Sequence, residues 1–169
     1  MKFLGVDPGA SGAVSVFDDL SFLGVMDLSH EVVSGEKMFD LISVRDEIIE
    51  IAGGQIDMVF IEKVGARSAQ GVKSMFSFGE RFAEVKCLGL TLTKNVVFLT
   101  PQSWKASAGL IGQDKNMSAK KCAKLYPDLA DSFVQANSRC KDGFKYFDGR
   151  GDSALIGLMG YKKFKKEKL

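Results

Sequence analysis

Four acidic residues stand where the local sequence pattern predicts the end of a strand or the start of a helix. Asp7 ends a short apolar run and is followed by the turn-forming pair Pro-Gly, and Glu62 ends a second apolar run. Asp148 and Asp152 stand four residues apart, directly ahead of the apolar segment 153–159. The carboxyl ends of central strands are where open α/β sheets bind their ligands, so Asp7 and Glu62 are candidates for one shared site.

Carboxylates held side by side repel each other unless a cation or a proton lies between them. Their hard oxygen atoms suit Mg²⁺ or Mn²⁺. Each acid also has a more ordinary interpretation by itself. Asp7 before Pro-Gly can be a turn residue, Glu62 a solvated strand end, and Asp152 a helix N-cap. A metal site is favoured because one fold would bring all of these acids together.

The hydrophobic pattern predicts three successive strands, followed by helices that alternate with two further strands. A helix start is predicted at Thr100-Pro101, and residues 138–147 are expected to form a loop. This order predicts an α/β fold with a five-stranded mixed sheet, three strands antiparallel, and helices on both faces. The strands are expected at residues 2–7, 12–17, 22–27, 57–62 and 96–99, and the remaining helices at 36–52, 74–90, 117–126 and 152–164.

Two predicted helices carry specific packing expectations. In the helix 36–52 one face is expected to be buried, and glycines in the helix 74–90 are expected to allow close packing on the sheet. The residues concerned are Met38, Leu41, Ile42, Ile48, Ile49 and Ala52 in the first helix, and Gly79 and Gly89 in the second.

The chain has 169 residues, of which 46% are hydrophobic, enough for one α/β domain with a full core. We expect a single domain over residues 1–162 and a basic C-terminal tail over 163–169. The cysteines, at positions 87, 122 and 140, are few and far apart, which favours a reducing compartment over a disulfide or zinc framework. With no signal-peptide core and no apolar run of about 20 residues, we expect no membrane association and a cytoplasmic location, the host cytoplasm if a phage encodes the protein.

The net charge of +2 conceals a strong asymmetry along the chain. Residues 1–62 contain 3 basic and 12 acidic side chains, whereas residues 63–169 contain 20 basic and 9 acidic ones. A basic half that includes selected carboxylates suits a polyanionic partner. A solvated charged surface with a basic end is the alternative interpretation.

A set of short motifs, taken in their order along the chain, resembles the RuvC family of Holliday-junction resolvases. The resemblance is greatest to the shorter phage-type members of that family. The resemblance extends from Phe3 to Lys162. The motifs are Gly5-Val-Asp-Pro-Gly-Ala-Ser-Gly12, Ile61-Glu62-Lys63, Gln70-Gly-Val-Lys-Ser-Met-Phe-Ser-Phe-Gly79, Thr100-Pro-Gln-Ser-Trp-Lys105, Asp114-Lys115 and Asp148-Gly-Arg-Gly-Asp-Ser-Ala-Leu155.

The resemblance implies an RNase H-like fold, a homodimer with two active sites, and paired nicks in opposing strands of a four-way DNA junction. It also implies that Asp7, Glu62, Asp148 and Asp152 bind divalent metal, Mg²⁺ with Mn²⁺ as a substitute. Two ions about 4 Å apart would flank the scissile phosphate, so no protein base is needed. The last two acids are four residues apart here, whereas the cellular resolvases have three. His30 lies in no motif and is interpreted as structural or surface.

The family's junction-facing segment corresponds to residues 64–78, where amides and cations would meet phosphates and an aromatic ring would stack on an unpaired base. Phe78 lies on the helical stripe and is interpreted as core, and Trp104 as packing. The predicted DNA contacts are Arg67, Gln70, Lys73, Ser74 and Phe76, together with Lys105, Lys115, Lys120 and Lys121 as backbone contacts.

Three other functions compete with a junction resolvase. The turn after Asp7 also resembles the phosphate-binding hairpin of actin-like ATPases, but those need two such domains, so we expect no nucleotide cofactor. A junction-binding protein without nuclease activity could keep the basic face, although the four acids argue against it. An RNase H-fold nuclease acting on flaps, forks or RNA–DNA hybrids is the nearest rival among enzymes.

Overall fold

The structure, a computed structural model, describes residues 1–65 and 71–167. Its centre is a five-stranded sheet with the strand order β3-β2-β1-β6-β7. The first three strands pair antiparallel, whereas β6 and β7 continue the sheet in parallel with β1. The expected mixed sheet is confirmed. Its strands are β1 (Lys2–Asp7), β2 (Ala13–Asp18), β3 (Ser21–Asp27), β6 (Met58–Glu62) and β7 (Val96–Leu99).

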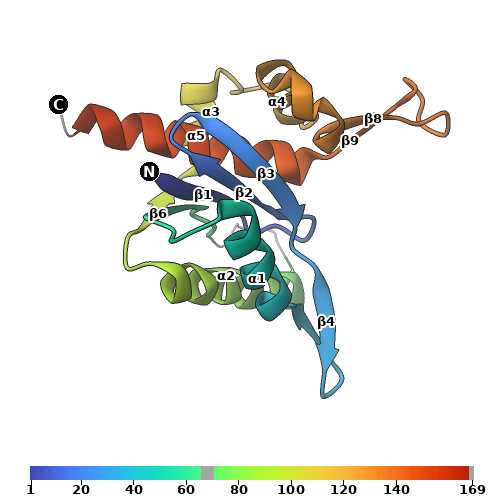
Figure 1. Ribbon diagram of the computed structural model, residues 1–169. Coiled ribbons are helices and arrows are strands. Elements are labelled where there is room, and N and C mark those ends of the chain that lie inside the picture. The colour runs from blue at the N-terminus through green and yellow to red at the C-terminus, as the bar shows by residue number, and fades with distance from the viewer. Residues whose placement is uncertain (66–70, 168–169) are drawn as a thin grey trace.

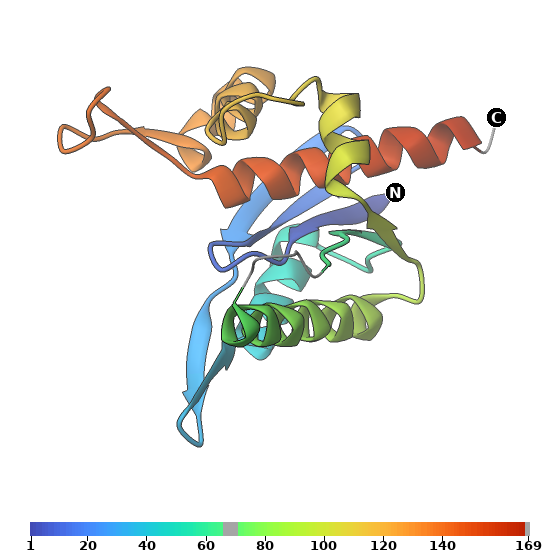
Figure 2. The ribbon, with the colours of Figure 1, turned by 180° about the vertical axis from the view of Figure 1, so that it is seen from behind.

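Helices cover both faces of the sheet, as Figure 1 and the reverse view in Figure 2 show. On one face lie α1 (Leu41–Ala52) and α2 (Val72–Leu92), and on the other α5 (Asp148–Glu167) runs across the strands. The helices α3 (Pro101–Ala108) and α4 (Met117–Leu125) and the 3-10 helix η1 (Pro127–Ser132) lie on the α5 side. The result is a three-layer α/β arrangement.

Each face of the sheet has its own hydrophobic core, because successive residues of a strand point to opposite faces. In β1, Phe3 packs toward α5 and Leu4 toward α1 and α2. The Phe3 ring stacks on Phe17 with centroids 4.8 Å apart and on Tyr161 at 4.6 Å. This aromatic stack fixes α5 against the centre of the sheet.

The backbones of β1 and α5 approach unusually closely at a pair of glycines. A Cβ atom on Gly5 would lie 2.1 Å from the carbonyl oxygen of Ser153 and 2.4 Å from the Gly157 nitrogen. No side chain fits in that space, so glycine at position 5 lets the helix pack directly on the strand. Because α5 begins at Asp148, this contact also sets the distance between its first turn and Asp7.

The prediction that residues 36–40 are helical is wrong. The chain forms a two-stranded hairpin there, with β4 (His30–Val33) paired to β5 (Glu36–Phe39). Ser34 and Gly35 both have positive φ, 52° and 88°, which is the conformation of a tight hairpin turn. The helix starts only after Asp40, whose side chain accepts a hydrogen bond from the Ser43 nitrogen.

The hairpin also changes which face of α1 is buried. Val44, Ile48 and Ala52 face the core, as expected for the last two. Three residues predicted to be buried are exposed, because Met38 belongs to the hairpin and the other two point away from the sheet. Their exposed fractions are 37% for Met38, 68% for Ile42 and 47% for Ile49.

The expected loop at 138–147 is in part a second hairpin, in which β8 (Val134–Ala136) pairs with β9 (Phe144–Tyr146). The last helix begins at Asp148, one turn earlier than predicted, and continues to Glu167. Residues 163–167 of the expected tail are therefore helical. Figure 1 shows both hairpins extending from the body on the side where α5 begins.

The glycines of α2 differ in their surroundings. Gly89 is buried against Ile61, Val59 and Val96, as the close-packing expectation requires. A Cβ atom on Gly79 would meet nothing within 4 Å, so the close-packing expectation is wrong for this position.

Within the two described ranges, the helices are all too short or too polar to cross a bilayer. All three cysteines are free thiols, with Cys122 buried, Cys87 exposed and Cys140 between these extremes.

Candidate active site

Asp7 is the last residue of β1, and its carboxylate points to the carboxyl edge of the sheet. The backbone N–H of Gly9 donates to Asp7 Oδ1 at 2.9 Å, which fixes the side chain in the turn that follows the strand. Burial raises the pKa of the Asp7 carboxyl to about 7, although the Gly9 hydrogen bond acts to lower it. The nearby carboxylates of Asp152, Glu62 and Asp148 raise this pKa further.

Glu62 ends the neighbouring parallel strand. Val6 and Ile61 are register partners in β1 and β6, so the following residues, Asp7 and Glu62, leave the sheet side by side. The indole N–H of Trp104 donates to Glu62 Oε1 at 2.9 Å. Trp104 is only 1% exposed, which agrees with its expected packing role. Its hydrogen bond to a candidate metal ligand is a role that the sequence analysis missed.

Asp148 and Asp152 come from the first turns of α5. Burial raises the pKa of Asp152 to about 6, and the Glu62 and Asp148 carboxylates also raise it. A hydrogen bond from the Ser118 side chain and the charge of Lys105 act in the opposite direction. Asp148 has a cationic neighbour, since Lys115 Nζ lies 3.9 Å from Asp148 Oδ2. Two strands and one helix therefore bring four acids to one edge.

The four carboxylates interact electrostatically but do not surround a common point closely enough to hold a metal ion together. In the parts of the chain that the structure describes, no three acidic, histidine or cysteine side chains are grouped so that they could hold a metal ion. The raised pKa of Asp7 reports the repulsion among these acids and the cost of their burial. A divalent cation would relieve that repulsion, so hard oxygen donors and local charge both fit a metal.

Arg150 fixes the start of α5 between the two acids of the helix. Its guanidinium donates to both carboxylate oxygens of Asp27, at 2.7 Å and 2.8 Å, and to the Ser132 carbonyl oxygen at 3.2 Å. The same group lies 4.3 Å from the centre of the Phe147 ring. A bidentate arginine–carboxylate pair fixes the relative orientation of the two side chains as well as the distance between them. The sequence signal for this role is an arginine between two aspartates, and Arg150 was not among the predicted site residues.

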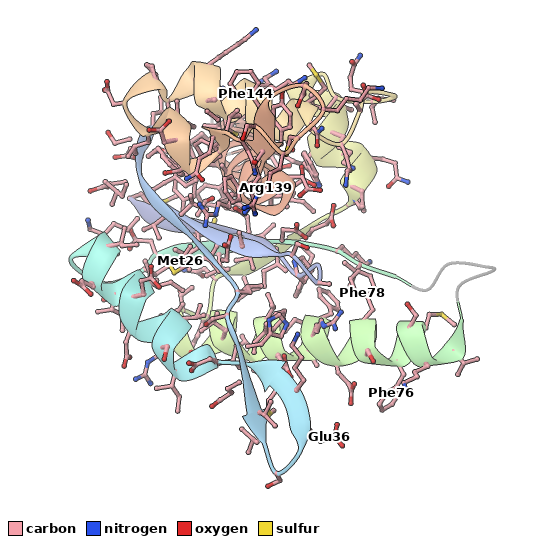
Figure 3. The ribbon with its side chains drawn as sticks, turned by 90° about the vertical axis from the view of Figure 1, so that its right-hand side faces the viewer. Met26, Glu36, Phe76, Phe78, Arg139 and Phe144 are labelled. Carbon is pink, nitrogen blue, oxygen red and sulfur yellow. The ribbon has the colours of Figure 1, made fainter. Side chains whose placement is uncertain are left out.

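The predicted DNA contacts lie in several places. Lys105 and Lys115 border the acids, whereas Lys120 and Lys121 belong to α4 and Lys73, Ser74 and Phe76 to the first turns of α2. Figure 3 shows Phe76 on the outer side of α2 and Phe78 toward the sheet edge. Arg67 and Gln70 lie outside the described residues.

Phe78, expected in the core, is half-buried. It lines a recess of about 330 Å³ together with Glu62 and Lys63. The Phe78 ring therefore lies beside the candidate metal site, because Glu62 both lines this recess and is one of the candidate metal ligands.

His30 has a structural environment. Its ring lies 4.8 Å from Phe39 within the β4–β5 hairpin, and burial lowers its pKa. Its Nε2 atom is buried and has no protein hydrogen-bond partner. A neutral, partly buried ring agrees with the expected structural role.

The architecture has counterparts among solved structures. Thermus thermophilus RuvC in complex with a Holliday junction substrate superposes with a TM-score of 0.56 at 12% identity, covering 98% of this chain and 96% of that one. A second Thermus thermophilus RuvC structure gives a TM-score of 0.53 at 14% identity, covering 98% and 97%. This chain has the RuvC fold.

No family model and no curated protein sequence matches the chain. The RuvC fold is thus shared through architecture, with few identical residues.

Proposed function

We propose that the protein is a metal-dependent endodeoxyribonuclease that resolves four-way DNA junctions by paired cuts in opposing strands. The observation that carries this proposal is the convergence of Asp7, Glu62, Asp148 and Asp152 at one sheet edge, where burial raises the pKa of Asp7 and the other three carboxylates add to that effect. The RuvC fold supports the proposal, since a solved structure of that fold is a complex with a Holliday junction substrate.

The same four carboxylates would hold divalent metal, Mg²⁺ or Mn²⁺, with two ions per site. When bound, such ions lower the pKa of the attacking water and stabilise the charge on the departing oxygen. Asp7 and Asp152 have raised pKa values, so they must lose any bound proton before they act as ligands.

The remaining residues of the site position these acids. Trp104 orients Glu62 through its N–H, and the Arg150–Asp27 pair holds the first turn of α5. Lys105 and Lys115 place positive charge at the border of an acidic site, where a phosphate must approach. Positioning of reactants relative to charged groups is a large part of catalysis of this type.

Junction binding is assigned to cations and one ring around this edge. Lys73, Lys120 and Lys121 would contact phosphates, and the exposed Phe76 would stack on an unpaired base. Ser74, at the start of α2, is proposed as a further DNA contact, and Arg67 and Gln70 remain proposed contacts on their sequence alone. A second copy of the chain would supply the second active site, which paired cutting requires.

The test uses labelled four-way junctions, forks, flaps, plain duplexes and RNA–DNA hybrids with Mg²⁺ or Mn²⁺. We expect paired junction nicks from the wild type and from Asp128→Asn, an exposed control in η1. Asp7→Asn should bind the junction but lose cutting by at least about a hundredfold. Sedimentation of the protein alone should show a dimer.

Other outcomes identify the competing functions. Preferred cutting of hybrids, forks or flaps would indicate a different RNase H-fold nuclease. Binding without cutting in either metal would indicate a junction-binding protein. Full activity of Asp7→Asn would remove the basis of the proposal.

A further inference from the structure

A groove of about 770 Å³ lies between α4 and the β8–β9 hairpin. Its walls are apolar and aromatic, formed by Met117, Val134, Phe144 and Tyr146. Phe144 is 46% exposed although it is a large apolar side chain. Figure 1 shows the hairpin extending beside α4, and Figure 3 shows the labelled Phe144 on it. This volume is within the range of sites that hold small-molecule ligands.

Three lysines of α4, Lys120, Lys121 and Lys124, line the same groove. The Lys120 ammonium lies 4.8 Å from the centre of the Tyr146 ring, and Lys121 Nζ donates to the Ala108 carbonyl oxygen. Outside the groove lining, the hairpin turn carries the exposed Arg139 and Lys141 and also Asp142, whose Oδ2 accepts a hydrogen bond from the Tyr146 hydroxyl at 2.9 Å. The groove therefore combines aromatic walls with a positively charged rim.

The groove and a recess beside the candidate active site share Tyr146 as a lining residue. Only Phe147 separates the end of β9 from Asp148, the first residue of α5. The recess, of about 360 Å³, is lined by Lys145, Asp148 and Ser11, which belongs to the turn after Asp7. The hairpin thus borders the acids at its base and the groove along its length.

The chemistry of the groove indicates which form of nucleic acid it fits. A duplex presents phosphates and sugars on its outside and hides the faces of its bases, so it would use the lysines but not the apolar walls. An unpaired strand presents both phosphates and base faces, which match cations and aromatic rings. The carboxylates of an acidic peptide would satisfy the cations but would not stack on Phe144 and Tyr146, whereas every nucleotide of an unpaired strand brings both a phosphate and a base face.

We propose that the groove between α4 and the β8–β9 hairpin binds an unpaired DNA strand next to the cut site. Its phosphates contact Lys120, Lys121 and Lys124, and a base packs against Phe144 and Tyr146. The inference rests on the proposed function, because it assigns a path to the DNA of that same site.

The first experiment separates base stacking from charge. Binding of a fluorescent ten-residue thymidine oligonucleotide is compared with binding of an abasic oligonucleotide with the same number of phosphates, in EDTA. The wild type should bind the thymidine strand at least about fivefold more tightly, which is the lower end of stacking on one aromatic side chain. Phe144→Ala should remove most of that preference, whereas Leu125→Ala, on α4 but outside the groove lining, should keep it.

The second experiment tests the rim. Lys124→Gln should weaken binding of both oligonucleotides by a similar factor and make binding less dependent on salt. Lys163→Gln, near the far end of α5, is the matched control and should leave both unchanged. Lys124 is exposed, so its replacement tests the groove even if Phe144→Ala proves unstable.

The results distinguish this inference from the proposed nuclease function. If the wild type shows no preference for the thymidine strand, or Phe144→Ala and Lys124→Gln both bind like the wild type, the groove is not a strand site even where junction cutting is intact. If the oligonucleotide results are as expected but no junction is cut, the groove assignment is supported and the resolvase proposal fails.

Discussion

Trp104 donates its indole N–H to Glu62 Oε1 at 2.9 Å while almost all of its ring is buried in the α5-side core. The hydrogen bond connects a hydrophobic core residue to a candidate metal ligand. Since the ring cannot move without disturbing its packing, the glutamate is held in one orientation. Partners of this kind strongly influence metal affinity.

Trp104→Phe should therefore keep the fold and weaken the site. We expect Mn²⁺ affinity, measured by calorimetry, to fall about 10-fold to 100-fold, with junction cutting reduced in proportion. Stability should fall by only about 1 to 3 kcal/mol, from a lost hydrogen bond and a smaller ring. Phe98→Leu, an exposed aromatic position on β7, is the control and should bind metal normally. Unchanged Mn²⁺ affinity in Trp104→Phe would show that the hydrogen bond does not position Glu62.

Asp7 should make the metal-free protein less stable as the pH rises. Its pKa is about 7 in the folded state, above the ordinary 3.8, so the folded protein binds the proton more tightly than the unfolded chain does. The stability that the protonated group provides is fully present below about pH 4 and is lost as the pH rises to about 7. Asp7→Asn does not titrate, so its stability relative to the wild type should increase across this window by about 1 to 4 kcal/mol and then level off.

Urea unfolding in EDTA at several pH values measures this difference. Adding Mg²⁺ at pH 8 should stabilise the wild type more than Asp7→Asn, because the ion binds the folded state. A stability difference that does not vary with pH would contradict the raised pKa.

The Arg150–Asp27 pair should contribute more than an ordinary surface ion pair, because it is bidentate and the Arg150 side chain is partly buried, with 22% exposed, although Asp27 is 55% exposed. A double-mutant cycle with Arg150→Lys and Asp27→Asn, followed by urea unfolding, should give a coupling of about 0.5 to 2 kcal/mol. Cutting should fall in both single variants, since both release the first turn of α5. The pair Arg45→Lys and Asp46→Asn, on the exposed surface of α1, should show little coupling. Equal coupling in the two cycles would count against a special role for Arg150.

Two glycine substitutions should have opposite effects. Gly5→Ala places a methyl group 2.1 Å from a backbone oxygen of α5, which cannot move aside alone, so the unfolding free energy should fall by at least about 3 kcal/mol. Gly79→Ala adds a methyl group in open space on an α2 helix position and should raise stability by about 0.5 to 1 kcal/mol. Thermal unfolding of both variants checks this, and a stable Gly5→Ala protein would refute the close packing of β1 and α5.

The sequence by itself determined the five strands and the mixed character of the sheet, whereas the spatial order of the strands comes from the structure. Alternating and continuous apolar runs specify strands directly, and the strand ends made Asp7 and Glu62 candidates for one shared site. The parallel pairing of β1 with β6 then brings them to the same edge. The helix start at Thr100 could also be predicted, because a capping hydroxyl and a following proline are local signals. In the structure, Thr100 Oγ1 accepts a hydrogen bond from the backbone N–H of Ser103.

Local patterns failed where pairing decided the structure. Residues 36–39 fit a helical face, yet Ser34 and Gly35 turn the chain so that they pair with β4. Residues 144–146 carry no strong strand pattern and become β9 only because Val134–Ala136 lies opposite them. Hydrogen bonding to a distant partner is not encoded in the periodicity of a short segment.

The tertiary structure alone decided the surroundings of the acids. The burial that raises the pKa of Asp7, the indole that holds Glu62 and the arginine pair that holds α5 all join residues far apart in sequence. The groove beside α4 exists only because β8 and β9 pair. Residue type and spacing indicate which groups are able to do chemistry, whereas pKa, orientation and access depend on neighbours that only the folded chain brings together.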